Sequence, residues 1–258
     1  TNMASNSPFS QLPGHLFKAL VTIAVLGIPF SHAQRDASTP PGFGPAPQLP
    51  LPQHSVIPTV NIAPAKGWPT GVIPKAAEGL KVVAFARDLD HPRWIYVLPN
   101  GDVLVAESNA PPKTDGGGIV GMIMGFFQNR AGARTISANR ITLLRDTDGD
   151  GVADVRTVFA EGLSSPFGMA LVGDTFYVAN TDSIMKFTYS EGATTLATSG
   201  TKLVDLPAGT INHHWTKNII ASIDGRKLYA TAGSNSNVAE NGMAAEAGRA
   251  AIYEVDLA

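Results

Sequence analysis

The sequence contains no cysteine among its 258 residues, and this absence removes several kinds of chemistry. Disulfide bonds, thiolate nucleophiles and cysteine-based zinc or iron–sulfur sites are all excluded. Charged residues are also few, at 16% of the chain, and the formal net charge is −2. Because proteins that bind nucleic acid normally carry a basic patch, this balance argues against nucleic acid as a partner. The 44% of hydrophobic residues is nevertheless enough to form a packed core.

Long hydrophobic runs are scarce. The clearest one, ALVTIAVLGI at 19–28, follows Lys18 and precedes Ser31-His32-Ala33. It is shorter than the roughly 20 apolar residues that cross a bilayer. A basic residue, a short apolar run and small residues before a cleavage point are typical of a signal peptide, here residues 1–33. An anchor helix or a core helix is the alternative. The pattern predicts a periplasmic or secreted protein with no membrane-spanning segment after the signal is removed.

Residues 34–78 are rich in proline and poor in charge, as in PPGFGPAPQLPLPQ at 40–53. Proline removes backbone donors and favours extended polyproline II structure, so this segment is predicted to be a linker. A proline-rich ligand for an aromatic groove is the alternative. The globular domain is then expected to span residues 79–258.

The globular part has the pattern of an all-β protein. Runs such as 80–86, 94–98 and 103–106 are short, contain many β-branched and aromatic residues, and are separated by turn residues. Further outer strands are expected at 141–144, 184–189 and 252–255. The segment 116–127 (GGGIVGMIMGFF) is predicted to be a short helix or loop over one face, or alternatively a contact for a membrane or an electron acceptor.

One unit of this pattern recurs three times. PRWIYVLPNGDVLVAES from Pro92 is echoed from Pro166 and again from His214, each copy with a glycine in a tight turn between two strands. Without the glycine-rich insertion 109–138, the spacing of the copies falls near 40–50 residues, which is typical of a β-propeller blade. Propellers close with 4–8 blades, so we expect a partial β-propeller of about three blades, truncated at the C-terminus. An irregular β-sandwich is the alternative.

Three segments carry a resemblance to a known family: HPRWIYVLPNGDVLVAES at 91–108, ANRITLLRDTDGDGVADVRTVFAEGLSSPFGMAL at 138–171 and INHHWTKNIIASIDGRKLYATAGSNSN at 211–237. They resemble the glucose/sorbosone dehydrogenases, over about 79–258. The resemblance implies a six-bladed propeller that oxidises a sugar or aldehyde with pyrroloquinoline quinone (PQQ) and Ca²⁺. It also implies an external electron acceptor, either a quinone or a cytochrome.

The same resemblance assigns a catalytic base. His214, in the segment Asn212-His213-His214-Trp215, matches the family histidine that removes the hydroxyl proton during hydride transfer, and imidazole suits that task near neutral pH. Without the resemblance, a polar cluster at a blade edge, satisfied by backbone hydrogen bonds, is the favoured interpretation of this segment. The family's cofactor-binding cations are expected beyond Ala258, so residues 1–258 are predicted not to bind PQQ by themselves.

A second motif has the spacing of a calcium-binding loop. Asp146, Asp148, Asp150 and Asp154 follow the alternating pattern of an EF-hand loop, although position 12 is Thr157 instead of a glutamate. We predict a structural Ca²⁺ site here, distinct from the family's calcium at the quinone. The alternative is an acidic turn between strands.

Two other functions are consistent with a propeller. A lactonase-type hydrolase would need a central metal, for which Glu107 and Asn180 are inner-strand candidates. A non-catalytic propeller would bind carbohydrate or protein partners, and the fold alone does not separate these functions. The polar strip 233–242 is expected on the same side as His214, where it could line the mouth of a substrate site.

Overall fold

The computed structural model describes residues 62–112, 119–133, 135–196 and 199–257, together with four isolated positions at Gly42, Pro47, Leu49 and Leu51. The chain divides into two compact units, 1–59 and 60–258. The predicted signal peptide lies outside the described residues, as does most of the predicted linker. Residues 62–78 contain turns and no helix or strand.

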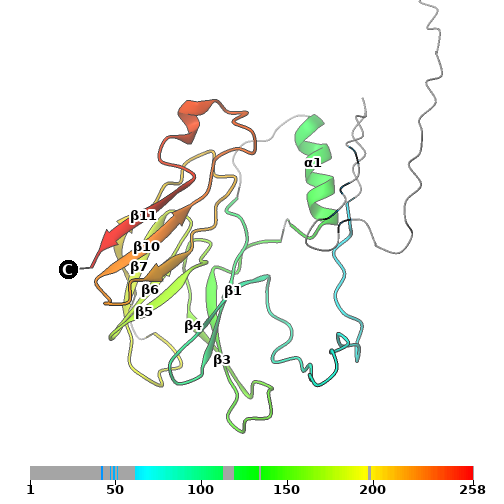
Figure 1. Ribbon diagram of the computed structural model, residues 1–258, viewed down its shortest axis with the longest axis vertical. Coiled ribbons are helices and arrows are strands. Elements are labelled where there is room, and N and C mark those ends of the chain that lie inside the picture. The colour runs from blue at the N-terminus through cyan, green and yellow to red at the C-terminus, as the bar shows by residue number, and fades with distance from the viewer. Residues whose placement is uncertain are drawn as a thin grey trace, which may run out of the picture. The chain divides into compact units, whose positions relative to one another are not determined.

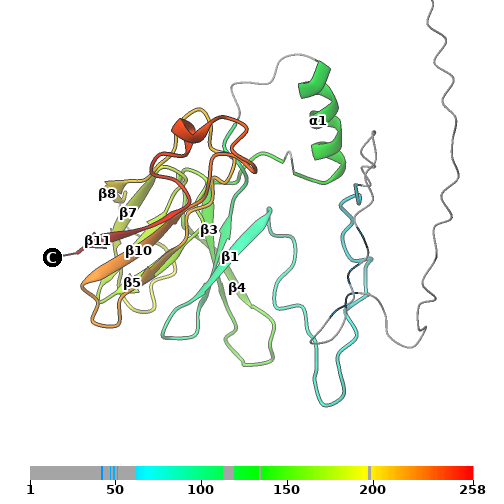
Figure 2. The same ribbon diagram turned by 45° about the horizontal axis from the view of Figure 1, so that its top comes forward.

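The described residues of the second unit contain three antiparallel sheets (Figures 1 and 2). The first sheet has the strand order β1-β2-β3-β4, comprising Pro92–Val97, Val103–Glu107, Arg140–Arg145 and Val155–Ala160. The second has the order β5-β6-β7-β8, comprising Met169–Val172, Thr175–Ala179, Ser183–Thr188 and Thr201–Asp205. The third has the order β11-β10-β9, comprising Ala251–Asp256, Lys227–Ala232 and Ile219–Ala221. Each strand pairs with its neighbour in sequence, which is the meander of a propeller blade.

The first two strands of each sheet form the hairpins that the repeat predicts. The turn glycines Gly101, Gly173 and Gly225 have φ values of 90°, 59° and 69°. This left-handed region is costly for residues with a Cβ atom, which explains why each copy of the repeat has glycine at the turn. The three repeats of the sequence are therefore the three sheets of the structure.

Two expectations about strands were wrong. Residues 80–86 are not a strand: the run lies beside the β3–β4 loop, where the Phe85 oxygen accepts one hydrogen bond from Ala153 N. The runs 141–144 and 184–189 are strands, but they are not outermost, because β4 and β8 pair with their outer sides. In the third sheet, β11 does occupy the outer position.

In the part of the chain that the structure describes, two helical segments lie in connections between paired strands. Helix α1, Ile119–Arg130, lies in the long connection between β2 and β3, and the 3-10 helix η1, Met243–Glu246, lies between β10 and β11. The segment 116–127 was expected to be a short helix or loop, and its residues 119–127 are helical, whereas residues 116–118 lie outside the described part. No helix in the described ranges combines the length and hydropathy that a bilayer crossing needs.

The hydrophobic core has two parts, and the second sheet contributes to both. Phe159 of β4 and Phe176 of β6 pack edge to face in the first part, with ring centroids 5.4 Å apart. Ile184 of β7 and Leu228 of β10 are fully buried in the second part. Because burying such a side chain contributes about 1.5–3 kcal/mol, these contacts hold neighbouring sheets together as propeller blades.

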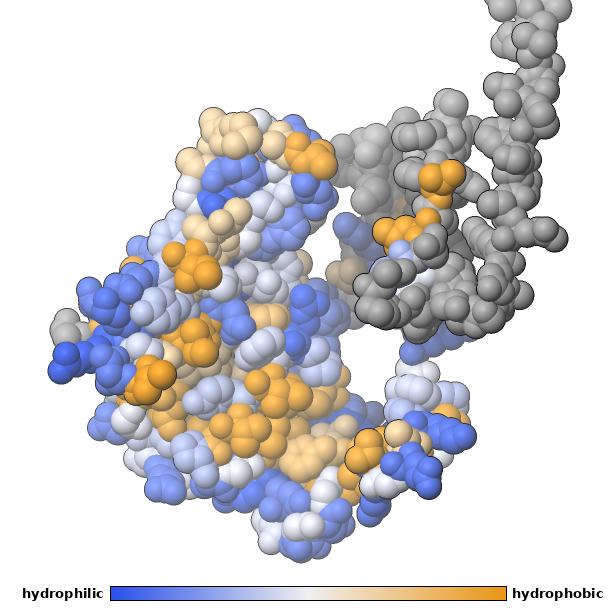
Figure 3. All heavy atoms as spheres, in the orientation of Figure 1, coloured by the Kyte–Doolittle hydropathy of each residue, from blue (hydrophilic) through white to orange (hydrophobic). Residues whose placement is uncertain are grey.

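The first strand of every sheet lies at the same open groove. Residues of β1, β5 and β9 together line a space of about 440 Å³, and each of these strands is at one edge of its sheet. In a β-propeller, the first strand of each blade is the inner strand and lies beside the central axis, and β1, β5 and β9 converge in this way. Apolar side chains reach the surface in several patches on the face shown in Figure 3. Ile95 of β1 and Ile220 of β9 are 62% and 67% exposed, so the first and third sheets each leave apolar groups uncovered.

Candidate active site at the start of the third sheet

His214 lies five residues before β9, on the connection that leads from the second sheet to the inner strand of the third. Its side chain is exposed, and its Nδ1 atom lies 2.8 Å from the main-chain oxygen of Ser234. The Ser234 Oγ atom is 3.0 Å from the same nitrogen and donates its own proton to the Ser236 oxygen, 2.8 Å away. A carbonyl oxygen can only accept, so Nδ1 carries the hydrogen of the neutral ring. The lone pair is therefore on Nε2.

A glycine allows this contact. Gly233 immediately follows β10, and a Cβ atom built on it would lie only 2.5 Å from the Cβ atom of His214. No side chain fits in that space. The backbone at the end of β10 and the histidine segment therefore approach each other closely because residue 233 is glycine.

Aromatic and cationic groups surround the starts of the inner strands. The guanidinium carbon of Arg93, at the start of β1, lies 5.1 Å from the centroid of the Trp215 ring. Trp94 stacks obliquely on Phe167, with ring centroids 5.1 Å apart. These contacts join the first sheet to the connections before β5 and β9, so the three strand starts and His214 share one rim.

Lys217 is a functional candidate that the sequence did not reveal. It is completely buried, and its Nζ atom donates to the Trp215 oxygen at 3.3 Å. Burial, followed by repulsion from the Arg249 cation, lowers the pKa of Lys217 from 10.5 to about 8. A lysine before a short apolar strand normally lies in solvent, so nothing in the sequence signals this burial.

The acidic loop, residues 146–154, lies at the rim opposite to the one that contains His214. It connects β3 to β4, at the end of the first sheet where β1 turns into β2, whereas the inner strands begin at the other end. Carboxylate oxygens of Asp146, Asp148 and Asp154 all lie within 4.8 Å of one another, and Asp150 does not join this group. The loop is thus separate from His214.

Hydrogen bonds within the loop bring its carboxylates together. Asp146 accepts from Gly151 N at 2.9 Å and Gly149 N at 2.8 Å, and the Gly151 hydrogen bond contributes most to lowering the pKa of Asp146. Asp154 accepts from the Thr147 backbone N at 2.6 Å, which likewise lowers its pKa. These bonds favour the charged carboxylates that a cation requires.

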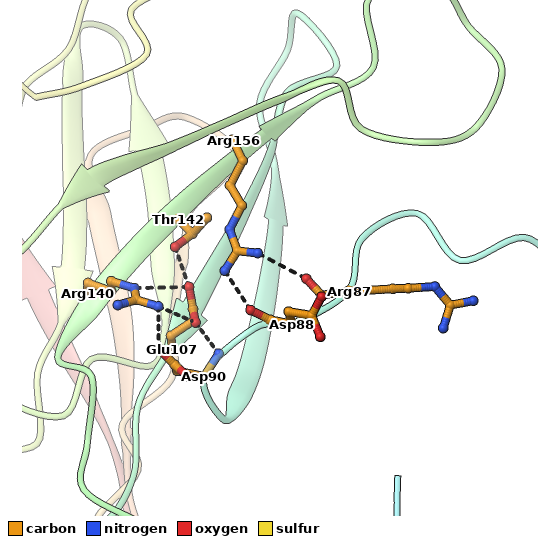
Figure 4. A network of polar contacts seen from close by, with 7 residues as sticks. All are labelled: Arg87, Asp88, Asp90, Glu107, Arg140, Thr142 and Arg156. Carbon is orange, nitrogen blue, oxygen red and sulfur yellow. Dashed lines mark hydrogen bonds and ion pairs between the residues drawn. The ribbon is translucent and has the colours of Figure 1, made fainter. Parts of the chain in front are cut away.

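The two candidates for a hydrolytic metal are not on inner strands. Glu107 ends β2 and Asn180 follows β6, and both of these strands are second in their sheets. The buried Glu107 carboxylate accepts from Arg140 Nη2 at 2.9 Å and Nε at 3.2 Å, and also from Thr142 Oγ1 and Asp90 N (Figure 4). The Asn180 oxygen accepts from Ser164 N at 3.2 Å. Both groups have protein partners, so the expectation of a central metal site at these residues is wrong.

The same network fastens the segment before β1 to the first sheet. Arg140 also pairs with Asp90 at 2.7 Å, and Arg156 of β4 donates to the main-chain oxygens of Arg87 and Asp88 at 3.0 and 2.8 Å (Figure 4). Glu107 therefore has a structural role.

Several solved structures are similar to this chain. The PQQ domain of pyranose dehydrogenase from Coprinopsis cinerea, in its holo form, is similar with a TM-score of 0.50 and 17% identity, over 70% of this chain and 37% of that one. A calcium structure of a family AA12 carbohydrate-active enzyme from Trichoderma reesei has a TM-score of 0.49 and 18% identity, over 71% and 40%. A putative glucose dehydrogenase from Thermus thermophilus has a TM-score of 0.41 and 19% identity, over 69% and 48%. The chain spans less than half the length of each.

The first of these likenesses confirms the expected fold, that of a PQQ sugar dehydrogenase domain. No curated protein sequence matches the chain. One family of sequences, described as "Domain of unknown function (DUF7133)", matches residues 75–256. That match covers all three sheets, and the chain therefore belongs to the DUF7133 family.

Proposed function

We propose that the chain is part of a PQQ-dependent oxidoreductase that oxidises a sugar or an aldehyde, with His214 as the catalytic base. The observation that carries this proposal is the hydrogen bond from His214 Nδ1 to the Ser234 oxygen, which leaves Nε2 as an exposed proton acceptor. The fold shared with a pyranose dehydrogenase PQQ domain gives further support.

The chemistry requires a base beside the hydroxyl group that is oxidised. PQQ, when bound, would accept hydride from the substrate carbon. His214 Nε2 would take the proton of the hydroxyl group on that carbon, so that the carbonyl double bond forms as the hydride leaves. The ring would then carry a positive charge, which the Ser234 oxygen stabilises through its bond to Nδ1. A base positioned in this way typically contributes about 10²- to 10⁴-fold to the rate.

One described cation suits the quinone carboxylates. Arg93 is exposed and lies over Trp215, the residue after His214. Its planar guanidinium can pair with one carboxylate of PQQ. The other cations implied by the resemblance are expected beyond Ala258. The acidic loop does not fit a calcium ion at the quinone, because it lies at the opposite rim.

A periplasmic or secreted location follows from the predicted signal peptide at 1–33. An external acceptor, either a quinone or a cytochrome, would reoxidise the cofactor after each turnover.

The proposal is tested by dye-linked oxidation of aldoses and aldehydes, with and without added PQQ and Ca²⁺, using the protein in its full natural length. Oxidation that depends on PQQ is the expected result. Lactone hydrolysis without PQQ would favour the hydrolase, and sugar binding without any turnover would favour a non-catalytic propeller.

A further inference from the structure

One threonine hydroxyl group in the second sheet forms hydrogen bonds with the residues on either side of the His213–His214 pair. Thr181, in the turn between β6 and β7, is 5% exposed. Its Oγ1 atom accepts a hydrogen bond from Asn212 Nδ2 at 2.9 Å and lies 3.0 Å from the Trp215 oxygen. The carbonyl can only accept, so the hydroxyl proton points to Trp215 and a lone pair faces Asn212. The directions of both hydrogen bonds of Thr181 Oγ1 are therefore fixed. His213 and His214 lie in the chain between the two bonded residues.

Asn212 and the backbone of Thr181 are themselves fixed by further hydrogen bonds. The Asn212 side-chain oxygen accepts from Arg249 Nη1 at 2.9 Å, and Arg249 Nη2 also donates to the Ala208 and Ile211 oxygens at 2.7 and 3.1 Å. The backbone N of Thr181 donates to the Ser164 oxygen at 2.9 Å. Threonine is also restricted at χ1, which fixes its hydroxyl group in space.

We propose that Thr181 is a positioning residue for His214, acting from the neighbouring blade. Residues 212 and 215 are tied to one atom, so the two residues between them form a short closed loop. This closure turns His214 toward Ser234, where the Nδ1 hydrogen bond sets the tautomer. The orientation of the His214 ring depends only on these contacts, whereas its consequence for the reaction rests on the proposed function.

Loss of the Thr181 hydroxyl group should change the orientation of His214 more than it changes the stability of the protein. A typical hydrogen bond contributes about 1 kcal/mol to folding, so the loss of two should leave the protein folded. A catalytic group displaced by about 1 Å can cost on the order of 10²-fold in rate. A purely structural threonine would reduce stability without changing the state of the His214 ring.

The test compares Thr181→Val, which keeps the shape and removes the hydroxyl, with Thr181→Ser, which restores the hydroxyl. Long-range ¹H–¹⁵N spectra of the imidazoles, recorded on the chain at a pH where they are neutral, report which ring nitrogen carries the proton. We expect His214 to be protonated at Nδ1 in the wild type and in Thr181→Ser. We expect a mixture of tautomers in Thr181→Val. Wild-type His214 signals in a folded Thr181→Val protein would overturn the proposal.

A second variant covers the case in which Thr181→Val does not fold. Asn212→Ala removes the other end of the contact at a site that is partly exposed, and it should give the same mixed His214 signals. Unchanged signals in Asn212→Ala would equally overturn the proposal. In the full-length protein, we expect kcat to fall at least tenfold in Thr181→Val with KM little changed, and to recover in Thr181→Ser. If no oxidation is detected in any form, the proposed function fails, while the imidazole spectra still decide the positioning claim.

Discussion

His214 and Ser234 are joined by a bond whose direction is unambiguous: the imidazole Nδ1 lies 2.8 Å from a main-chain oxygen, which cannot donate. Because the acceptor belongs to the backbone, substitution of the Ser234 side chain leaves it in place. The bond depends instead on the close approach of the backbone at Gly233. Any change that separates these two segments should alter the tautomer of His214.

Gly233→Ala should displace His214. The new Cβ atom would lie 2.5 Å from the His214 Cβ atom, so one of the two segments must move. We expect mixed tautomers in the imidazole spectra and a loss of activity of about tenfold or more. Gly67→Ala is the matched control, since nothing lies within 4 Å of its added Cβ atom. Wild-type His214 signals in Gly233→Ala would contradict the assigned contact.

Stability should rise with pH above about 8 because of Lys217. Its pKa is about 8 in the folded chain and 10.5 ordinarily, so between these values the unfolded state binds more protons. Unfolding free energy, measured by denaturant titration at pH 7.5 and pH 10, should increase across this window. Lys217→Met should flatten this increase and stabilise the protein at pH 7.5 by about 1–3 kcal/mol.

The exposed Lys186 provides the control for that experiment. Lys186→Met should leave the increase with pH intact. An equal slope in wild type and Lys217→Met would show that Lys217 titrates as an ordinary lysine.

Glu107→Gln should destabilise the protein strongly. It removes the charge of a fully buried carboxylate that is bound to Arg140, and breaking such a pair from one side costs about 3 kcal/mol. Thermal or chemical unfolding measures this directly. The exposed pair Lys202–Asp205 provides the comparison, because Asp205→Asn should cost less than about 1 kcal/mol. Similar small effects for both variants would argue against a structural role for Glu107.

Calcium should stabilise the first sheet if the acidic loop binds it. Addition of CaCl₂ should raise the melting temperature, by about 2–4 °C for each kcal/mol of binding free energy. Asp148→Asn removes one of the three converging carboxylates and should abolish the response, whereas Asp174→Asn, in an exposed hairpin turn, should not. A melting temperature that Ca²⁺ leaves unchanged would show that the loop is an acidic turn only.

Much of the fold could be predicted from local sequence. The hairpins around Gly101, Gly173 and Gly225 combine β-branched strands with a residue suited to positive φ, and both signals act within a few residues. The run 80–86 has the same residue types without the strand. Such residues favour a half-buried extended surface, but they do not supply a pairing partner.

The candidate site was less predictable. His214 came from a resemblance, and the groups that hold it come from distant segments. Thr181 contacts residues 31 and 34 positions away, and the burial of Lys217 depends on how the second and third sheets pack. No local pattern encodes such contacts. The misplacement of Glu107 has the same origin, since its partner Arg140 is 33 residues distant.

The role of His214 as the base is tested most directly by comparing His214→Gln with His213→Gln in PQQ-dependent oxidation by the full-length protein. Both histidines are exposed neighbours, but of the two only His214 is assigned the role of base. We expect His214→Gln to lower kcat by about 10²-fold or more and His213→Gln to retain most of the activity. Equal activity in His214→Gln and wild type, or a larger loss in His213→Gln, would contradict that role.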